Sequence, residues 1–245
     1  MREVITVQGI VISAMPVGEY DRRVVLMTKE LGKIAAFARG ARRPNSSLLA
    51  STRPFVFGTF SLYPGRDAYT IQAAEVAEYF DELSSNIETI AYGYYFLEIA
   101  DYYGREGVNE TLMINLLYVS LKALLNKKLD NDLVKMIFEL RAIAINGSYP
   151  DFFHCISCGK EIEEGVFSVR DHGVYCSECK KIPKNGIWLN AAAVYTLQYI
   201  IVAPINKLYT FTLSEQTEKT VRDVIEQCKR QYQDKEFRSL EVLKQ

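Results

Sequence analysis

The sequence lacks an excess of charge of either sign. Its 245 residues carry 29 Lys and Arg against 30 Asp and Glu, which gives a formal net charge of -1. A protein that coats nucleic acid uniformly, or one with a polybasic tail, would have a net charge well above zero, so both classes are excluded. Any charged function must therefore be local. The composition, 49% hydrophobic and 24% charged, is that of a globular protein with one or two core-forming units.

Long hydrophobic runs are also missing. The opening residues MREVITVQG include no apolar run of signal-peptide length, so we expect no secretion. One charge-free stretch runs from Asn185 to Asn206. Within it, Asn190 is a good N-cap and Pro204 a stop, which predicts a helix over Ala191–Ala203 of about 13 residues, or ~20 Å. A bilayer core needs ~30 Å, so we expect a buried core helix and no membrane contact.

The motifs of several enzyme classes are absent as well. The sequence has no P-loop of the Gly-x4-Gly-Lys-Ser/Thr type, no paired-histidine metal motif and no nucleophile elbow. The motifs that are present therefore give no support for an enzyme, which is consistent with the non-enzymatic function that the family resemblance described below implies.

Cysteine is scarce, but its placement is informative. Four of the five cysteines form two pairs, Cys155-x2-Cys158 and Cys176-x2-Cys179, with seventeen residues between the pairs. Two such pairs at this separation are typical of a structural zinc site, in which each pair supplies two thiolates to a tetrahedral ion. Because all four ligands are cysteines, no coordination position remains for water. We predict one structural zinc ion.

Disulfide formation and dithiol redox chemistry are the two alternatives to metal binding for these cysteines. Disulfides have little support, because a disulfide within one Cys-x-x-Cys pair closes only a small ring and so stabilises the fold little. In addition, nothing indicates an oxidising compartment. A redox dithiol would stand at a helix N-terminus, which lowers a thiol pKa, whereas the flanks here read as loops. A dithiol redox enzyme remains a rival that a measured zinc stoichiometry decides.

The first eighty residues are rich in short β-strand patterns separated by turn residues. Five short strands in this length predict a small closed barrel, and a five-stranded barrel of this size is commonly an OB-fold, which binds oligonucleotides. The predicted strands are Val4–Ile12, Arg22–Thr28, Lys33–Arg39, Pro54–Tyr63 and Ala68–Val76.

From Asp81 the pattern becomes helical on both sides of the cysteine segment. Helices before and after that segment are expected to pack together, so the zinc module is an insertion in, or an appendage to, one helical bundle. The predicted helices open at a Ser85–Glu88 capping box, after Asn109, at Asn131 (ending at Gly147), at Ala191, and after a Ser214 cap (reaching about Tyr232). The fold class is thus a multidomain α and β protein. Its predicted domains are an OB-fold over 1–80, helices over 81–150, a four-cysteine zinc module over 151–186 and further helices over 187–245.

Charge is distributed unevenly over these segments. Residues 1–78 hold ten basic and seven acidic side chains, an excess of three positive charges, whereas residues 79–150 hold six against ten. The stretch from Arg39 to Arg53 contains no acid at all. Guanidinium groups neutralise phosphates, and the glycine and serines of this loop allow close backbone approach and hydrogen bonds to phosphate oxygens. The candidate DNA contacts are Arg39, Arg42, Arg43, Lys33, Arg22, Arg23 and Arg53. Three barrel aromatics, Phe37, Phe55 and Tyr69, are predicted to pack in the core rather than to stack on bases.

Several short motifs follow one another along the chain in a specific order. They are Gly18-Glu19-Tyr20-Asp21, Thr28-x-Glu30-x-Gly32-Lys33, Arg39-Gly40-Ala41-Arg42-Arg43, Ser46-Ser47-Leu48-Leu49, Tyr95-Phe96-Leu97-Glu98, Phe138-Glu139-Leu140-Arg141, Gly147-x-Tyr149-Pro150 and the two cysteine pairs. In this order they resemble the RecO recombination-mediator family over essentially the whole chain. Two departures stand out. His172 precedes Gly173 where many members place two glycines, and Gly18–Asp21 rearranges the more usual Tyr-Gly-Glu-x-Asp order.

The resemblance implies an OB domain, a helical domain and a four-cysteine zinc module. It also implies a cytoplasmic, nucleoid-associated DNA repair function. Such proteins bind single- and double-stranded DNA, anneal strands coated with single-strand-binding protein by way of that protein's C-terminal tail, and act with RecR to promote RecA loading. The alternative is a zinc-ribbon and OB-fold nucleic-acid adaptor in another process such as transcription, which would not anneal coated strands.

Overall fold

The computed structural model describes residues 3–179, 183 and 185–244. The chain divides into two compact units, one of Met1–Leu125 with Phe237–Gln245 and one of Asn126–Glu236, which are described separately below. Among the described residues, no helix combines the length and the apolar character needed to cross a membrane.

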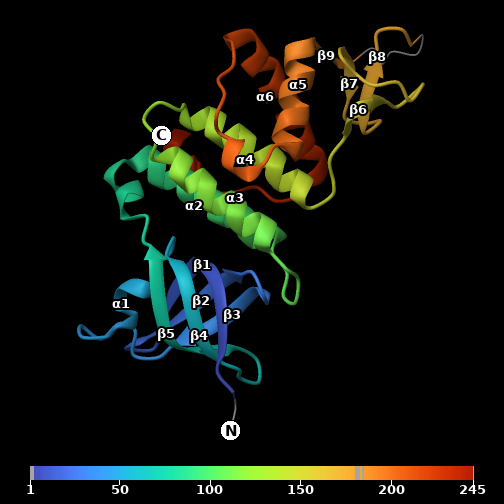
Figure 1. Cartoon of the computed structure of the whole chain (residues 1–245). Coiled ribbons are helices and arrows are strands. Elements are labelled where there is room, and N and C mark those ends of the chain that lie inside the picture. The colour runs from blue at the N-terminus through green and yellow to red at the C-terminus, as the bar shows by residue number, and fades with distance from the viewer. Residues whose placement is uncertain (1–2, 180–182, 184, 245) are drawn as a thin grey trace. The chain divides into compact units, whose positions relative to one another are not determined.

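Unit 1 is built on a closed five-stranded barrel (Figure 1). Its strands are β1 (Ile5–Val17), β2 (Asp21–Thr28), β3 (Gly32–Ala38), β4 (Phe57–Tyr63) and β5 (Tyr69–Glu78). They close in the order β1-β2-β3-β5-β4, with β3 and β5 parallel and every other neighbouring pair antiparallel. Side chains such as Leu26, Phe60 and Leu62 fill the interior and have no exposed surface. The predicted OB-like barrel is confirmed.

Two strand boundaries differ from the prediction by three residues or more, and the others agree to within two residues. β1 continues through Pro16, where a turn was expected, because proline lies opposite Arg22 at the very end of the ladder, where a missing N–H costs little. β4 begins at Phe57 rather than Pro54. Phe55 adopts a φ of 74°, in the left-handed region, and a strand cannot continue through that conformation.

The helices of unit 1 are a short α1 (Leu48–Ser51), α2 (Ile87–Tyr103) and α3 (Thr111–Leu124), with single 3-10 turns η1 (Asp81–Ser85) and η3 (Glu241–Lys244). α2 contacts β1 and α3 contacts β2. The predicted Ser85 cap of α2 is wrong. The Asn86 side chain accepts the Glu88 backbone N–H at 2.7 Å, while the Ser85 hydroxyl donates to the Glu82 carbonyl.

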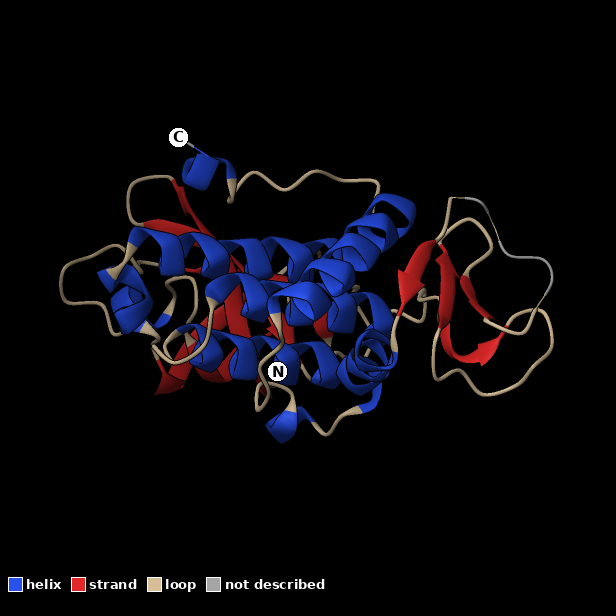
Figure 2. Cartoon of the chain, turned by 90° about the horizontal axis from the view of Figure 1, so that it is seen from above, coloured by secondary structure: helices blue, strands red, loops and turns tan. Residues whose placement is uncertain are grey.

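Unit 2 combines three helices with a small sheet (Figure 2). The helices are α4 (Asn131–Ile145), α5 (Ala191–Val202) and α6 (Glu215–Tyr232), with a 3-10 turn η2 (Ile205–Lys207) after α5. The sheet orders its strands β6-β8-β7-β9, over Asp151–Cys155, Gly173–Cys176, Gly165–Ser168 and Ile187–Leu189. α4 packs against both α5 and α6, so helices before and after the cysteine segment do pack together. The predicted caps Asn190 and Ser214 are confirmed.

One face of the sheet is buried together with the helices. Phe152, Phe167, Val174 and Leu189 have no exposed surface, and the Gln198 amide of α5 donates to the Phe152 carbonyl at 2.8 Å. His172, which stands in the turn before β8, has a φ of 58°. That left-handed conformation explains why glycine suits this position. The domain boundaries at 80, 150 and 186 remain predictions.

Candidate metal centre and nucleic-acid interface

The fold brings the two cysteine pairs together at the ends of neighbouring strands. Cys155 ends β6 and Cys176 ends β8, and these strands pair in parallel. Each pair then closes a tight turn. After the first, Gly159 has a φ of 74° and donates its N–H to the Cys155 carbonyl at 2.8 Å, and after the second, the Cys179 N–H donates to the Cys176 carbonyl at 3.1 Å.

The sulfur geometry suits a tetrahedral metal ion. All four Sγ atoms lie within 4.8 Å of one another. The separations are 3.6 Å between Cys155 and Cys179, 3.7 Å between Cys158 and Cys176, and 3.5 Å between Cys176 and Cys179. A tetrahedron with metal–sulfur bonds of ~2.3 Å has edges of ~3.8 Å, whereas a disulfide is ~2.05 Å long. The four predicted ligands could therefore hold one metal ion, and all four are free thiols.

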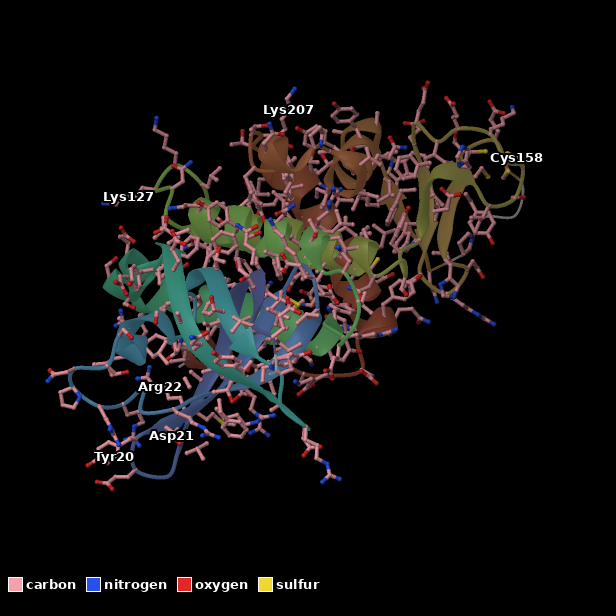
Figure 3. All side chains as sticks on the ribbon, turned by 60° about the horizontal axis from the view of Figure 1, so that its bottom comes forward. Tyr20, Asp21, Arg22, Lys127, Cys158 and Lys207 are labelled. Atoms are coloured by element: carbon pink, nitrogen blue, oxygen red, sulfur yellow. The ribbon has the colours of Figure 1, made fainter. Side chains whose placement is uncertain are left out.

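Local hydrogen bonds favour the thiolate form at Cys155. Burial opposes ionisation of this thiol, but backbone N–H groups, led by that of Cys176 at 3.3 Å from the sulfur, together lower its pKa to about 6. The thiolate is the form that binds metal. Cys158 is exposed at the tip of the sheet, as Figure 3 shows. Neither pair stands at the start of a described helix, which removes the feature that a redox dithiol would need.

On the barrel, the arginine-rich loop after β3 is folded against the turn between β1 and β2. The Gly40 N–H donates to the Asp21 carboxylate at 2.7 Å, and the Arg42 N–H donates to the Tyr20 carbonyl at 2.8 Å. The Arg42 guanidinium reaches the Glu19 carbonyl at 3.2 Å, and the Arg43 guanidinium stacks 5.1 Å from the centre of the Tyr20 ring. The Gly18–Asp21 motif thus orders the arginine loop. Figure 3 labels Tyr20 and Asp21 at this end of the barrel.

Three further predicted DNA contacts, Arg22, Lys33 and Arg53, also form contacts within unit 1. The Arg22 guanidinium donates to the Leu49 carbonyl at 2.7 Å, and Lys33 donates to the Asp101 carbonyl at 2.6 Å. Arg53 pairs with Asp81 at 3.1 Å, although both side chains stay about half exposed. Burial, followed by the positive charges of Arg42 and Arg53, lowers the pKa of Arg22. The guanidinium groups of Arg22, Arg42 and Arg53 therefore share one region of positive potential.

The remaining predicted arginines lie on the outer surface of the barrel. Arg23 and Arg39 are exposed. Arg23 stands directly opposite Phe37 across the β2–β3 ladder, and Arg39 follows Phe37 by two residues. The prediction that Phe37 packs in the core is wrong, because its side chain is only partly buried and lies on the outer face, whereas Phe55 is buried and Tyr69 packs partly buried against the core.

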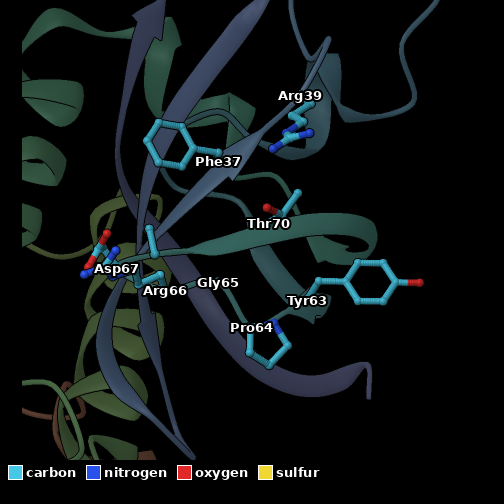
Figure 4. Close-up of a pocket in the computed structure, with 9 residues that line it drawn as sticks. Phe37, Arg39, Tyr63, Pro64, Gly65, Arg66, Asp67 and Thr70 are labelled. Carbon is cyan, nitrogen blue, oxygen red and sulfur yellow. The ribbon is translucent and has the colours of Figure 1, made fainter. Parts of the chain in front are cut away.

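Sequence reasoning missed Arg66 and the groove it helps to form. The groove has a volume of about 440 Å³ and is lined by Phe37, Arg39, Tyr63 at the end of β4, residues 64–68 of the β4–β5 loop, and Thr70 of β5 (Figure 4). The sequence did contain a signal that Phe37 faces outward. Side chains alternate between the two faces of a strand, so Phe37 lies on the same face as the charged Lys33 and on the opposite face from the buried Ile34.

Comparison with known proteins agrees with this geometry. The chain matches two family models, "Recombination protein O N terminal" over residues 1–80 and "Recombination protein O C terminal" over residues 84–241. It is 29% identical over 242 residues to the DNA repair protein RecO of Alkaliphilus metalliredigens, covering 98% of both chains. It is also 29% identical to that of Bacillus subtilis, over 97% of this chain and 93% of the relative, and 30% identical to that of Desulforudis audaxviator, over 97% and 95%. The chain therefore belongs to the RecO family of DNA repair proteins.

Proposed function

We propose that this protein is a non-enzymatic recombination mediator. It binds single- and double-stranded DNA, anneals strands coated with single-strand-binding protein, and acts with RecR to promote RecA loading in the nucleoid. Family membership supports the DNA repair process and favours it over an adaptor role in transcription. The observation that carries the DNA-binding part is the arginine loop, whose backbone is fixed by Asp21 and Tyr20 while Arg39, Arg42 and Arg43 remain exposed.

The arginine loop is the proposed phosphate contact. Annealing requires two polyanionic strands to come close, and guanidinium groups lower their mutual repulsion while leaving base edges free to pair. Arg23 and Arg53 extend the contact, and Lys33 and Arg22 contribute positive charge while also holding the barrel together.

Zinc is the proposed occupant of the four-cysteine site. Four thiolates in a tetrahedral arrangement select soft ions, and a full cysteine shell leaves no position for a reacting water. Its role is structural: it ties the end of β6 to the end of β8. RecR and the tail of single-strand-binding protein are proposed as partners on family grounds alone.

The DNA-binding part is tested by changing Arg39, Arg42 and Arg43 together to Glu. Because each neutralised phosphate contributes about 0.7 to the salt dependence on single strands, loss of three contacts lowers the slope of log K against log salt by about 2. We expect severely weakened binding of both single-stranded and duplex DNA, with an unchanged circular dichroism spectrum. Unchanged affinity at moderate salt would refute the assignment.

A further inference from the structure

The groove beside β3 differs in composition from the arginine loop. It joins the aromatic ring of Phe37 to two guanidinium groups, from Arg39 and Arg66, with Asp67 as its one carboxylate and Tyr63 at its edge. Its volume of about 440 Å³ falls in the range of small-ligand pockets, roughly 300–1,000 Å³. In Figure 4 the Phe37 and Arg39 side chains project from the same end of β3, Arg66 and Asp67 lie together on the β4–β5 loop, and the Tyr63 ring points away from Phe37.

Phe37 is held as a platform on the outer surface of the barrel. The strand register places it in a row of outward side chains that runs across four strands, between Arg23 on β2 and Thr70 on β5, with Met15 beyond Arg23. Met15 is 53% exposed, so the row is open to solvent at that end. Within the described part of the chain, no other aromatic ring stacks on Phe37.

The charges around this platform are positive and available. Arg23, Arg39 and Arg66 are all exposed, and among the described residues none of the three forms an ion pair with a carboxylate. With the single negative charge of Asp67, these three arginines give a net charge of +2 around the Phe37 ring. An aromatic face flanked by guanidinium groups matches a nucleotide, which offers a flat base and two flanking phosphates.

We propose that Phe37 stacks on one unpaired base of single-stranded DNA while Arg23, Arg39 and Arg66 contact the phosphates on either side. In a duplex each base face is covered by its neighbours, so this site contributes only where a base is unstacked. The groove therefore gives the protein a preference for single strands, which the arginine loop alone does not provide. This inference rests on the proposed DNA-binding function.

The test compares Phe37→Ala with wild-type protein on a single-stranded oligonucleotide and on the matching duplex. Since stacking of one base on an aromatic side chain is worth about 1–3 kcal/mol, we expect single-strand affinity to fall on the order of tenfold and duplex affinity to change by less than about twofold. The salt slope should stay the same, because no charge is removed. Phe37→Trp should restore single-strand binding, whereas Phe37→Leu, which keeps apolar bulk but has no π-face, should not.

Tyr79→Ala is the matched control, since Tyr79 is another exposed aromatic of unit 1, 40% exposed, that does not line the groove. It should leave both affinities unchanged. Equal losses of single-strand and duplex binding in Phe37→Ala, or no loss in either, would overturn the inference. If the triple arginine variant loses DNA binding while Phe37→Ala keeps its single-strand affinity, only the stacking site fails and the proposed function stands. If neither variant loses DNA affinity, both the stacking site and the proposed DNA-binding function are wrong.

Discussion

At the scale of single residues, the chain places several charged side chains where they stabilise the fold. Glu139 of α4 is fully buried, with Lys229 of α6 at 2.8 Å and Lys135 at 3.7 Å. Burial acts to lower the pKa of Lys229, but the carboxylates of Glu139 and Glu226 outweigh that effect and raise it. Arg141, two residues further along the same helix, donates to the Ile200 and Ala203 carbonyls at 3.0 and 3.1 Å and so caps α5. The Phe138–Arg141 motif of the sequence therefore has a structural explanation in this fold.

The buried ion pair predicts a large effect of Glu139→Gln. Removing one partner of a buried pair typically costs about 3–5 kcal/mol, and here it leaves Lys229 with the more exposed Glu226, at 3.0 Å, to balance its charge. We expect the free energy of unfolding, measured by urea denaturation, to fall by roughly that amount. Glu226→Gln is the control, because Glu226 is 40% exposed and its loss should cost no more than about 1 kcal/mol. Equal effects of the two substitutions would contradict this account.

At the scale of single elements, the sequence predicted most of the architecture because local signals agree with tertiary packing. Five alternating strands, the caps Asn190 and Ser214, and the Gly147 helix end all lie where the pattern indicated. The misses have physical causes. The left-handed Phe55 leaves no mark in a hydrophobic pattern, and Asn86 competes with Ser85 for the same cap.

The candidate site was predictable only in part. Spacing alone identified the four cysteines, because each ligand pair is local in sequence. The sequence could not distinguish the predicted arginines whose side chains are exposed from those whose side chains form contacts within unit 1. Whether Arg22 faces solvent or the Leu49 carbonyl depends on a contact 27 residues away, and Phe37 and Arg66 meet only when β3 and β5 pair.

Metal removal tests the cysteine site at the scale of the small sheet. The strands β6 to β9 are three to five residues long, so we expect the sheet to depend on the ion for its stability. Trp188 on β9 is the one tryptophan of the chain and is 50% exposed, so its fluorescence reports on this sheet. A chelator, or the double change Cys155→Ser with Cys176→Ser, should shift its emission to that of the unfolded protein.

The matching control is DNA affinity, which should change little because the barrel belongs to the other unit. Metal analysis of the purified protein should give one zinc ion per chain. Native Trp188 emission after complete metal loss would show that the sheet stands without the ion.

At the scale of the whole molecule, the net charge of -1 is the sum of opposing parts. The barrel segment is basic and the helical segment that follows is acidic, which supports the proposed DNA contact on the barrel and the proposed protein partners on other surfaces. Mixing the full chain with a peptide that carries the C-terminal tail of single-strand-binding protein should give binding in calorimetry at micromolar concentrations. A peptide of the same composition in scrambled order is the control. No heat of binding at those concentrations would count against this partner.

The most direct test of the central claim is a strand-annealing assay with complementary strands coated by single-strand-binding protein. We predict that the wild-type protein anneals the coated strands and that the variant with Arg39, Arg42 and Arg43 changed to Glu does not, although it remains folded. DNA binding by the wild-type protein without annealing of coated strands would contradict the account, as would full annealing by the triple variant.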